Sequence, residues 1–190
     1  MRVRWAVPFL LALLAACSST GSSVKVDYYS IGGRSIAGID REIKRRGPRI
    51  GGTGHAVAVA RIRIQPRYAT LASGGRCSTR NVKVDVNARV TLPRWRNRRQ
   101  ANRELAAAWD NIDRYTRLHE AVHVAIAFRY ARDLEKSIAA LTAPTCARLQ
   151  EDVSTLVTAR LDAHDRAQRK FDTDEQRRIR AIARQQAAAS

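Results

Sequence analysis

The chain of 190 residues lacks a long apolar run, has few acidic residues and contains only three cysteines. The apolar run at residues 7–16 is too short to span a bilayer, which excludes a transmembrane helix there. Lys and Arg number 35 against 17 Asp and Glu, so the formal net charge is +18. Such an excess favours adhesion to anionic surfaces such as lipid head groups. No known nucleic-acid-binding motif accompanies the charge, so nucleic acid is an unlikely partner.

The first residues have the pattern of an export signal. Arg2 and Arg4 precede the apolar run, which ends in Leu14-Ala15-Ala16-Cys17. This ending resembles the lipobox of bacterial lipoproteins, which implies a signal peptide at residues 1–16 and lipidation of Cys17. By the same resemblance, Ser18 favours an outer-membrane lipoprotein that faces the periplasm. The alternative is an ordinary signal peptide and a secreted protein.

The remaining cysteines, Cys77 and Cys146, form an even pair in an oxidising compartment. Such a pair predicts one disulfide. Two buried thiols are the alternative.

The mature chain predicts one α+β domain after a polar tether at residues 17–23. Residues 24–96 alternate in strand-like stretches around one short helix, which predicts a small antiparallel sheet packed on helices. Residues 97–176 are helical in pattern, with an expected break near 110–113 and a second long helix that Cys146 opens. A basic tail at residues 177–190 is expected to fray. The expected elements are strands at 24–30, 55–68 and 82–92, a helix at 35–46, and the helical part that follows.

The most informative stretch is residues 115–130, which has helix-forming residues and no Gly or Pro. It contains the pattern His119-Glu120-x-x-His123. Two histidines four residues apart lie on one helix face and can bind one Zn²⁺. Glu120 beside them can take a proton from an attacking water. The pattern therefore predicts a zinc site with Glu120 as the general base.

A wider set of motifs accompanies this pattern: Tyr29-x-x-Gly32, Gly47-Pro48, Leu92-Pro93-x-Trp95 and Trp109. Together with His119-Glu120-x-x-His123, this set resembles a bacterial family labelled predicted secreted zinc-dependent proteases, which is grouped with the zincin metallopeptidases. The resemblance covers most of residues 25–175 and implies a zincin-like fold. One departure concerns the last helix, where many members have Tyr-Asp-x-x-Thr-x-His-Gly. Here Phe171-Asp172 matches, but Arg177 stands at the place of the His.

A catalytic zinc ion needs a third protein ligand. His164 is the first choice, because it lies on the helix expected to return antiparallel to the His119 helix. Asp172 and Glu175 are carboxylate alternatives near the same face, whereas His55, at the start of a strand, is a weaker candidate.

These expectations converge on a zinc metallopeptidase of the cell envelope, anchored to the membrane by lipid, that hydrolyses a peptide or protein substrate. Glu120 would pass its proton to the leaving amine. Tyr115 or Arg117 would steady the oxyanion, and a sheet edge would hold the extended substrate. The alternative is a catalytically impaired zincin-like lipoprotein that acts as a binding or structural module of the envelope.

Overall fold

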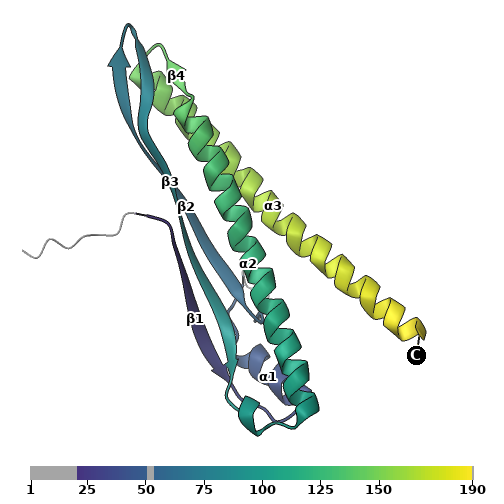
Figure 1. The fold of residues 1–190 in the computed structure, drawn as a ribbon. Coiled ribbons are helices and arrows are strands. Elements are labelled where there is room, and N and C mark those ends of the chain that lie inside the picture. The colour runs from purple at the N-terminus through teal and green to yellow at the C-terminus, as the bar shows by residue number, and fades with distance from the viewer. Residues whose placement is uncertain (1–20, 51–53, 190) are drawn as a thin grey trace, which may run out of the picture.

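The computed structural model describes residues 21–50 and 54–189. The predicted signal peptide and Cys17 therefore lie outside the described residues. The fold is α+β, as the sequence predicts: a small sheet lies against long helices (Figure 1). None of the described helices is both long and apolar enough to cross a membrane.

The sheet is mixed, which corrects the expectation of an antiparallel sheet. Strands β1 (Ser23–Ile31), β3 (Arg76–Trp95) and β2 (Val59–Ser73) lie in that order, and the two-residue β4 (Thr142–Ala143) pairs with β3. β2 and β3 form an antiparallel hairpin, whereas β1 pairs in parallel with β3. The reason is topological: β3 returns from the hairpin turn and inserts between β2 and β1, so that it runs in the direction of β1.

The hairpin is much longer than the sequence pattern predicts, because both strands continue to a two-residue turn at Gly74 and Gly75. These glycines have φ values of 59° and 73°, in the left-handed region that suits glycine in a tight hairpin turn. On β3, the side chains of Val84, Val86 and Ala88 are buried, as the alternation predicts. Their strand neighbours face the side of the sheet that carries no helix.

Helix α1 (Ile36–Arg46) closes the end of the sheet where β1 finishes. The Ser35 hydroxyl caps it by accepting a hydrogen bond from the Gly38 N–H at 3.1 Å. Ile39 and Ile43 bury their side chains against Trp95 and Trp109. The ring centroids of the two tryptophans lie 5.6 Å apart, so Trp95 at the end of β3 anchors the sheet to a helix.

Helix α2 (Arg103–Ala139) runs without interruption along one face of the sheet, after a single 3₁₀ turn η1 (Arg98–Gln100). The break expected near residues 110–113 is therefore wrong. Asp110 forms an ion pair with Arg98, and Asp113 pairs with Arg117 one turn later. With these charges paired and no Gly or Pro present, nothing interrupts the helix.

Helix α3 (Cys146–Ala189) starts at the hairpin end of the molecule and diverges from α2 toward its C-terminus (Figure 1). Leu149 and Val153 are buried near its start. The helix continues to Ala189, so the expected fraying from Arg177 is wrong. Arg177 and Arg178 pair with Asp174 and Glu175 across single turns, and the remaining residues are good helix formers.

The predicted disulfide between Cys77 and Cys146 is confirmed. It joins β3 near the hairpin turn to the first residue of α3. The main core lies below it, where α2 and α3 pack on the hairpin. Its buried members are Ile64, Val84, Val86, Ala127, Ala131, Leu134, Ile138 and Val153.

Candidate metal centre

His119 and His123 project from the middle of α2 on the same side. Their Nε2 atoms lie 3.1 Å apart, and their ring centroids are separated by 4.8 Å. The two rings are one helical turn apart, as the spacing of four residues requires. Their Nε2 atoms therefore converge on one point beside the helix.

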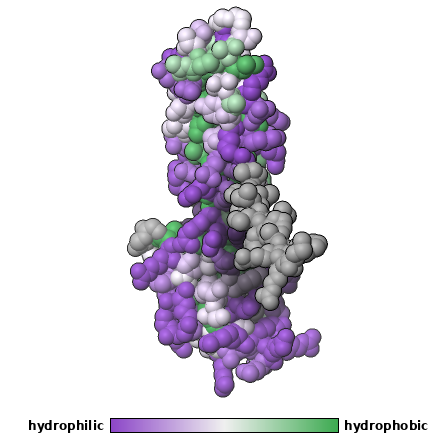
Figure 2. Space-filling view, turned by 90° about the vertical axis from the view of Figure 1, so that its left-hand side faces the viewer, coloured by the Kyte–Doolittle hydropathy of each residue, from purple (hydrophilic) through white to green (hydrophobic). Residues whose placement is uncertain are grey.

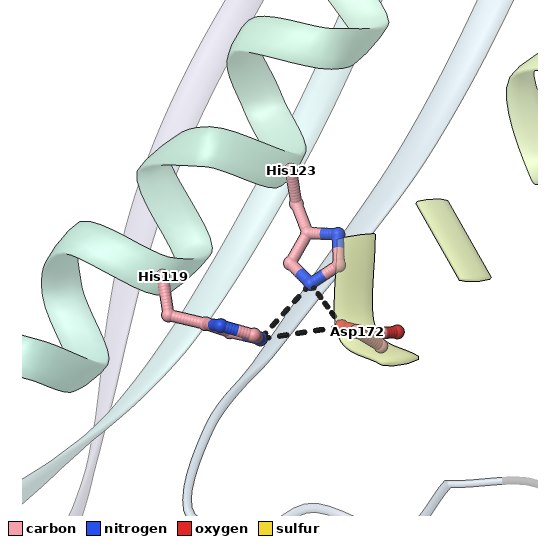
Figure 3. Close-up of side chains that lie close together, drawn as sticks. All are labelled: His119, His123 and Asp172. Atoms are coloured by element: carbon pink, nitrogen blue, oxygen red, sulfur yellow. Dashed lines mark hydrogen bonds and ion pairs between the residues drawn. The ribbon is translucent and has the colours of Figure 1, made fainter. Parts of the chain in front are cut away.

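The third member of the group is Asp172, which comes from α3 (Figure 3). Its Oδ1 atom lies 3.0 Å from His123 Nε2 and 3.3 Å from His119 Nε2. Phe171, the preceding residue, places its ring 4.9 Å from the His119 ring and 5.1 Å from the His123 ring. Two consecutive helices thus bring two nitrogens and one oxygen together beside an aromatic ring.

The donor set fits a zinc ion. Zinc binds nitrogen and oxygen at about 2.0–2.1 Å, so donors around a tetrahedral ion lie about 3.3 Å from one another. The three observed separations, 3.0, 3.1 and 3.3 Å, are close to this value. Two imidazoles with one carboxylate are also a donor set that catalytic zinc sites use. His119, His123 and Asp172 are therefore the residues that would hold the ion.

Glu120 is buried beside this group, with 6 % of its surface exposed. Its carboxylate accepts a hydrogen bond from the Ala60 N–H of β2. Burial raises the pKa of the Glu120 carboxyl. The pKa of His119 is lowered by burial and by the neighbouring charge of His123. A carboxyl with a raised pKa next to a metal group has the properties of a general base.

The group opens into a groove of about 1270 Å³ between β2, α2 and α3. One wall is the start of β2 and the segment before it, and β2 is an edge strand of the sheet. The lining includes apolar side chains from all three walls, among them Ile50, Val57, Ala58, Ile62, Ile112 and Ile179.

In a comparison with known families, the profile of a bacterial protein family of unknown function, DUF922, matches residues 26–178. The chain belongs to the DUF922 family. Comparisons with curated protein sequences and with solved structures give no significant match. The range matched by DUF922 contains all three donors and Glu120.

His164, the first choice for third ligand, does not join the donor group of this DUF922 chain. It is buried, with 7 % of its surface exposed, and its Nε2 lies 2.8 Å from the amide nitrogen of Gln168. Gln168 in turn contacts His123. Asp172, one of the two carboxylate alternatives, lies beside His119 and His123, where the sequence analysis expected His164 first.

The other carboxylate alternative, Glu175, lines the groove but has different partners. It accepts hydrogen bonds from the Tyr115 hydroxyl at 2.9 Å and from Arg178 at 2.8 Å. Burial would raise its pKa, but these hydrogen bonds outweigh burial and lower it. Burial and the bond to Glu175 raise the pKa of Tyr115. Tyr115 also lines the groove, where the sequence-based hypothesis expects a residue that steadies the oxyanion.

Arg117 and His55 lie elsewhere. Arg117 donates to Asp113 at 2.7 Å and to the Tyr28 hydroxyl at 3.2 Å, and it does not line the groove. These hydrogen bonds raise its pKa. His55 Nδ1 lies 2.5 Å from the Gly47 carbonyl oxygen, so its ring joins two segments near α1. Neither residue takes part in the donor group.

Proposed function

We propose that this DUF922 chain is a zinc metallopeptidase of the cell envelope. The observation that carries the proposal is the convergence of His119 Nε2, His123 Nε2 and Asp172 Oδ1 within 3.0 to 3.3 Å of one another, next to buried Glu120. A bound zinc ion supplies a Lewis acid that polarises the scissile carbonyl and lowers the pKa of a water.

The protein residues supply the rest of the chemistry. Glu120 accepts a proton from the attacking water as the water oxygen bonds to the carbonyl carbon. The proton then passes to the amine as the C–N bond breaks, which leaves a carboxylate product and a free amine. Tyr115, which lines the groove, is a candidate for a hydrogen bond to the developing oxyanion, in exchange for the bond that its hydroxyl donates to Glu175.

The groove supports a peptide as the substrate. β2 is an edge strand, and an edge strand presents backbone N–H and C=O groups to which an extended peptide can pair. Ile62, Ile112 and Ile179 offer apolar contacts to its side chains. An extended segment of an envelope protein fits these features.

The proposed location rests on the lipobox-like ending at Cys17 and on the disulfide. The bond between Cys77 and Cys146 supports an oxidising compartment, because cytosolic thiols stay reduced. We accordingly propose a lipoprotein of the outer membrane that faces the periplasm.

Zinc content and cleavage test the activity together. The purified protein should contain about one zinc ion per chain, and His119→Ala and Asp172→Ala should lose it. Glu120→Gln should retain zinc and lose at least about 100-fold of the cleavage of an unfolded protein substrate. Asp174→Asn is the matched control, because Asp174 lies on the same helix but pairs with Lys170 at 2.6 Å. An unchanged zinc content in Asp172→Ala would contradict the proposed metal site. An unchanged cleavage rate in Glu120→Gln would contradict the proposed mechanism.

A second candidate is a binding module for anionic surfaces with an impaired metal site. A cationic row crosses the helix-free face of the sheet, where Lys25 pairs in register with Arg89, and Arg89 with Arg61. Like charges directly opposite one another destabilise a sheet unless an anion lies between them. Of these three, Arg89 has an acidic partner, Asp27 at 3.1 Å. Absence of zinc from the purified protein would favour this candidate over the peptidase.

A further inference from the structure

Gln168 links one metal donor to a buried histidine that no other function accounts for. Its Oε1 lies 2.6 Å from His123 Nδ1, and its Nε2 lies 3.0 Å from the His123 carbonyl oxygen. The same Nε2 is 2.8 Å from His164 Nε2, and His164 Nδ1 is 3.0 Å from Asp165 Oδ1. Four residues thus form one continuous chain of hydrogen bonds from His123 to the surface.

A single backbone group fixes the direction of every bond in this chain. The His123 carbonyl oxygen can only accept, so the atom of Gln168 that faces it must be the amide nitrogen. The amide oxygen therefore faces His123 Nδ1, which must carry a proton and donate it. In the neutral ring, His123 Nε2 then has its lone pair directed at the donor group, 3.0 Å from Asp172 Oδ1.

The same logic extends to His164. The second N–H of the Gln168 amide faces His164 Nε2, which must therefore accept. The proton of His164 then resides on Nδ1, which donates to Asp165. A buried imidazole needs such partners, since an unpaired polar group in the interior is costly. His164 thus fixes the Gln168 amide from the side opposite to His123.

His119 provides the internal contrast. Its Nδ1 is buried and has no hydrogen-bond partner among the described residues. The partners of the His119 ring, Asp172 Oδ1 at 3.3 Å and His123 Nε2 at 3.1 Å, both lie at its Nε2. An outer residue therefore holds the ring of His123 through Nδ1, and none among the described residues holds that of His119 in this way. The two histidines are unequal donors, although they are equivalent in the sequence pattern.

We infer that Gln168 and His164 are positioning residues that hold His123 in the Nδ1–H tautomer, with Nε2 ready to bind a metal ion. The inference rests on the proposed function only for the identity of the ion, because the tautomer is a property of the metal-free protein. Outer partners of this kind typically contribute about 10–100-fold to metal affinity.

Nitrogen NMR of the imidazole rings in the metal-free protein tests the tautomer. With four histidines in the sequence, the spectrum is assignable by single substitutions. We expect His123 and His164 as Nδ1–H tautomers in the wild type. Gln168→Leu, which removes the amide at similar volume, should leave His123 without a fixed tautomer. A wild-type His123 that carries its proton on Nε2 overturns the inference, whatever the variants do.

Zinc affinity, measured by competition with a chromogenic chelator, tests the consequence. Gln168→Leu should weaken zinc binding by about 10–100-fold, and His164→Leu should weaken it by a smaller factor. Gln168→Glu retains an acceptor for His123 Nδ1–H, so it should stay within about threefold of the wild type. Gln150→Leu, an exposed residue of the same helix that does not line the groove, is the control and should bind like the wild type.

The outcomes separate the two proposals. Zinc bound equally by wild type and Gln168→Leu, with an unchanged His123 tautomer, overturns the positioning role and leaves the metal site intact. The expected tautomer in a protein that binds no zinc overturns the metal site and keeps the hydrogen-bonded chain. If Gln168→Leu fails to fold, the wild-type spectrum and the zinc affinity of His164→Leu still decide.

Discussion

At the scale of single residues, the axial position of α3 relative to α2 decides which residue of α3 lies beside His119 and His123. His164, Gln168 and Asp172 are spaced by four residues and share one face of α3. His164 and Asp172 are eight residues apart, which is about 12 Å along a helix. The sequence shows which residues share that face of α3 but not the axial position of α3 relative to α2. It therefore indicates the face that meets the two histidines, but not which residue on that face lies beside them. Phe171-Asp172, the part of the family ending that this chain retains, was the sequence signal for the residue that lies beside the two histidines.

Glu120 gives a stability prediction at the same scale. Burial raises the pKa of its carboxyl above the ordinary 4.5, so the folded chain holds this proton more tightly than the unfolded chain does. The free energy of unfolding therefore falls as pH rises from the unfolded pKa through the higher folded pKa. Glu120→Gln removes this loss and should raise the free energy of unfolding of the metal-free protein at pH 7 by roughly 0.5–2 kcal/mol.

Urea unfolding in the presence of a chelator measures this difference. It should shrink below pH 4, where Glu120 is protonated in both states. Glu151→Gln is the control, because Glu151 is a surface residue of α3 with 71 % of its side chain exposed, and it should change little. A destabilised Glu120→Gln at pH 7 would show that burial is not the dominant influence on this carboxyl.

At the scale of elements, alternation and helical spacing predicted the strands and helices well, but not how they connect. The buried face of β3 follows from the alternation of its residues. The parallel pairing of β1 with β3 did not, because side-chain alternation is the same in both orientations. The continuity of α2 depends on partners such as Arg98 for Asp110, which only the folded chain brings together.

The disulfide is the main covalent link between elements, and it closes a loop with a sequence separation of 69. A loop of this length predicts a loss of about 3–4 kcal/mol from the free energy of unfolding in the double variant Cys77→Ala with Cys146→Ala. Urea unfolding of the oxidised wild type and the variant measures it. The reduced wild type should match the variant, and a loss below about 1 kcal/mol would contradict the expected constraint.

At the scale of the whole molecule, charge is unevenly placed between the two faces of the sheet. Helices cover one face, while the other carries the cationic row of Lys25, Arg89 and Arg61. Figure 2 shows the side of the molecule on which the sheet lies, and hydrophilic side chains predominate there. A protein tethered close to a membrane would meet phosphate-bearing head groups with such a face.

Sedimentation with vesicles of phosphatidylglycerol and phosphatidylcholine tests this contact. The protein should bind at low salt and be released as salt increases. Lys25→Glu with Arg61→Glu should weaken binding at least about 10-fold. Arg103→Glu with Arg132→Glu changes the net charge equally but lies on α2, and it should have a smaller effect. Equal losses in both pairs would mean that net charge alone drives adhesion.

The divergence of α3 from α2 has a mechanical consequence. The same stretch of α3 supplies Asp172 to the donor group and Gln176 and Ile179 to one wall of the groove. Any movement that widens the groove also draws the carboxylate away from the two imidazoles, and any movement that narrows it presses them together. Entry of a peptide segment and retention of an ion are therefore coupled through the second half of α3, because the disulfide and the core around Val153 hold its first half against the sheet and α2.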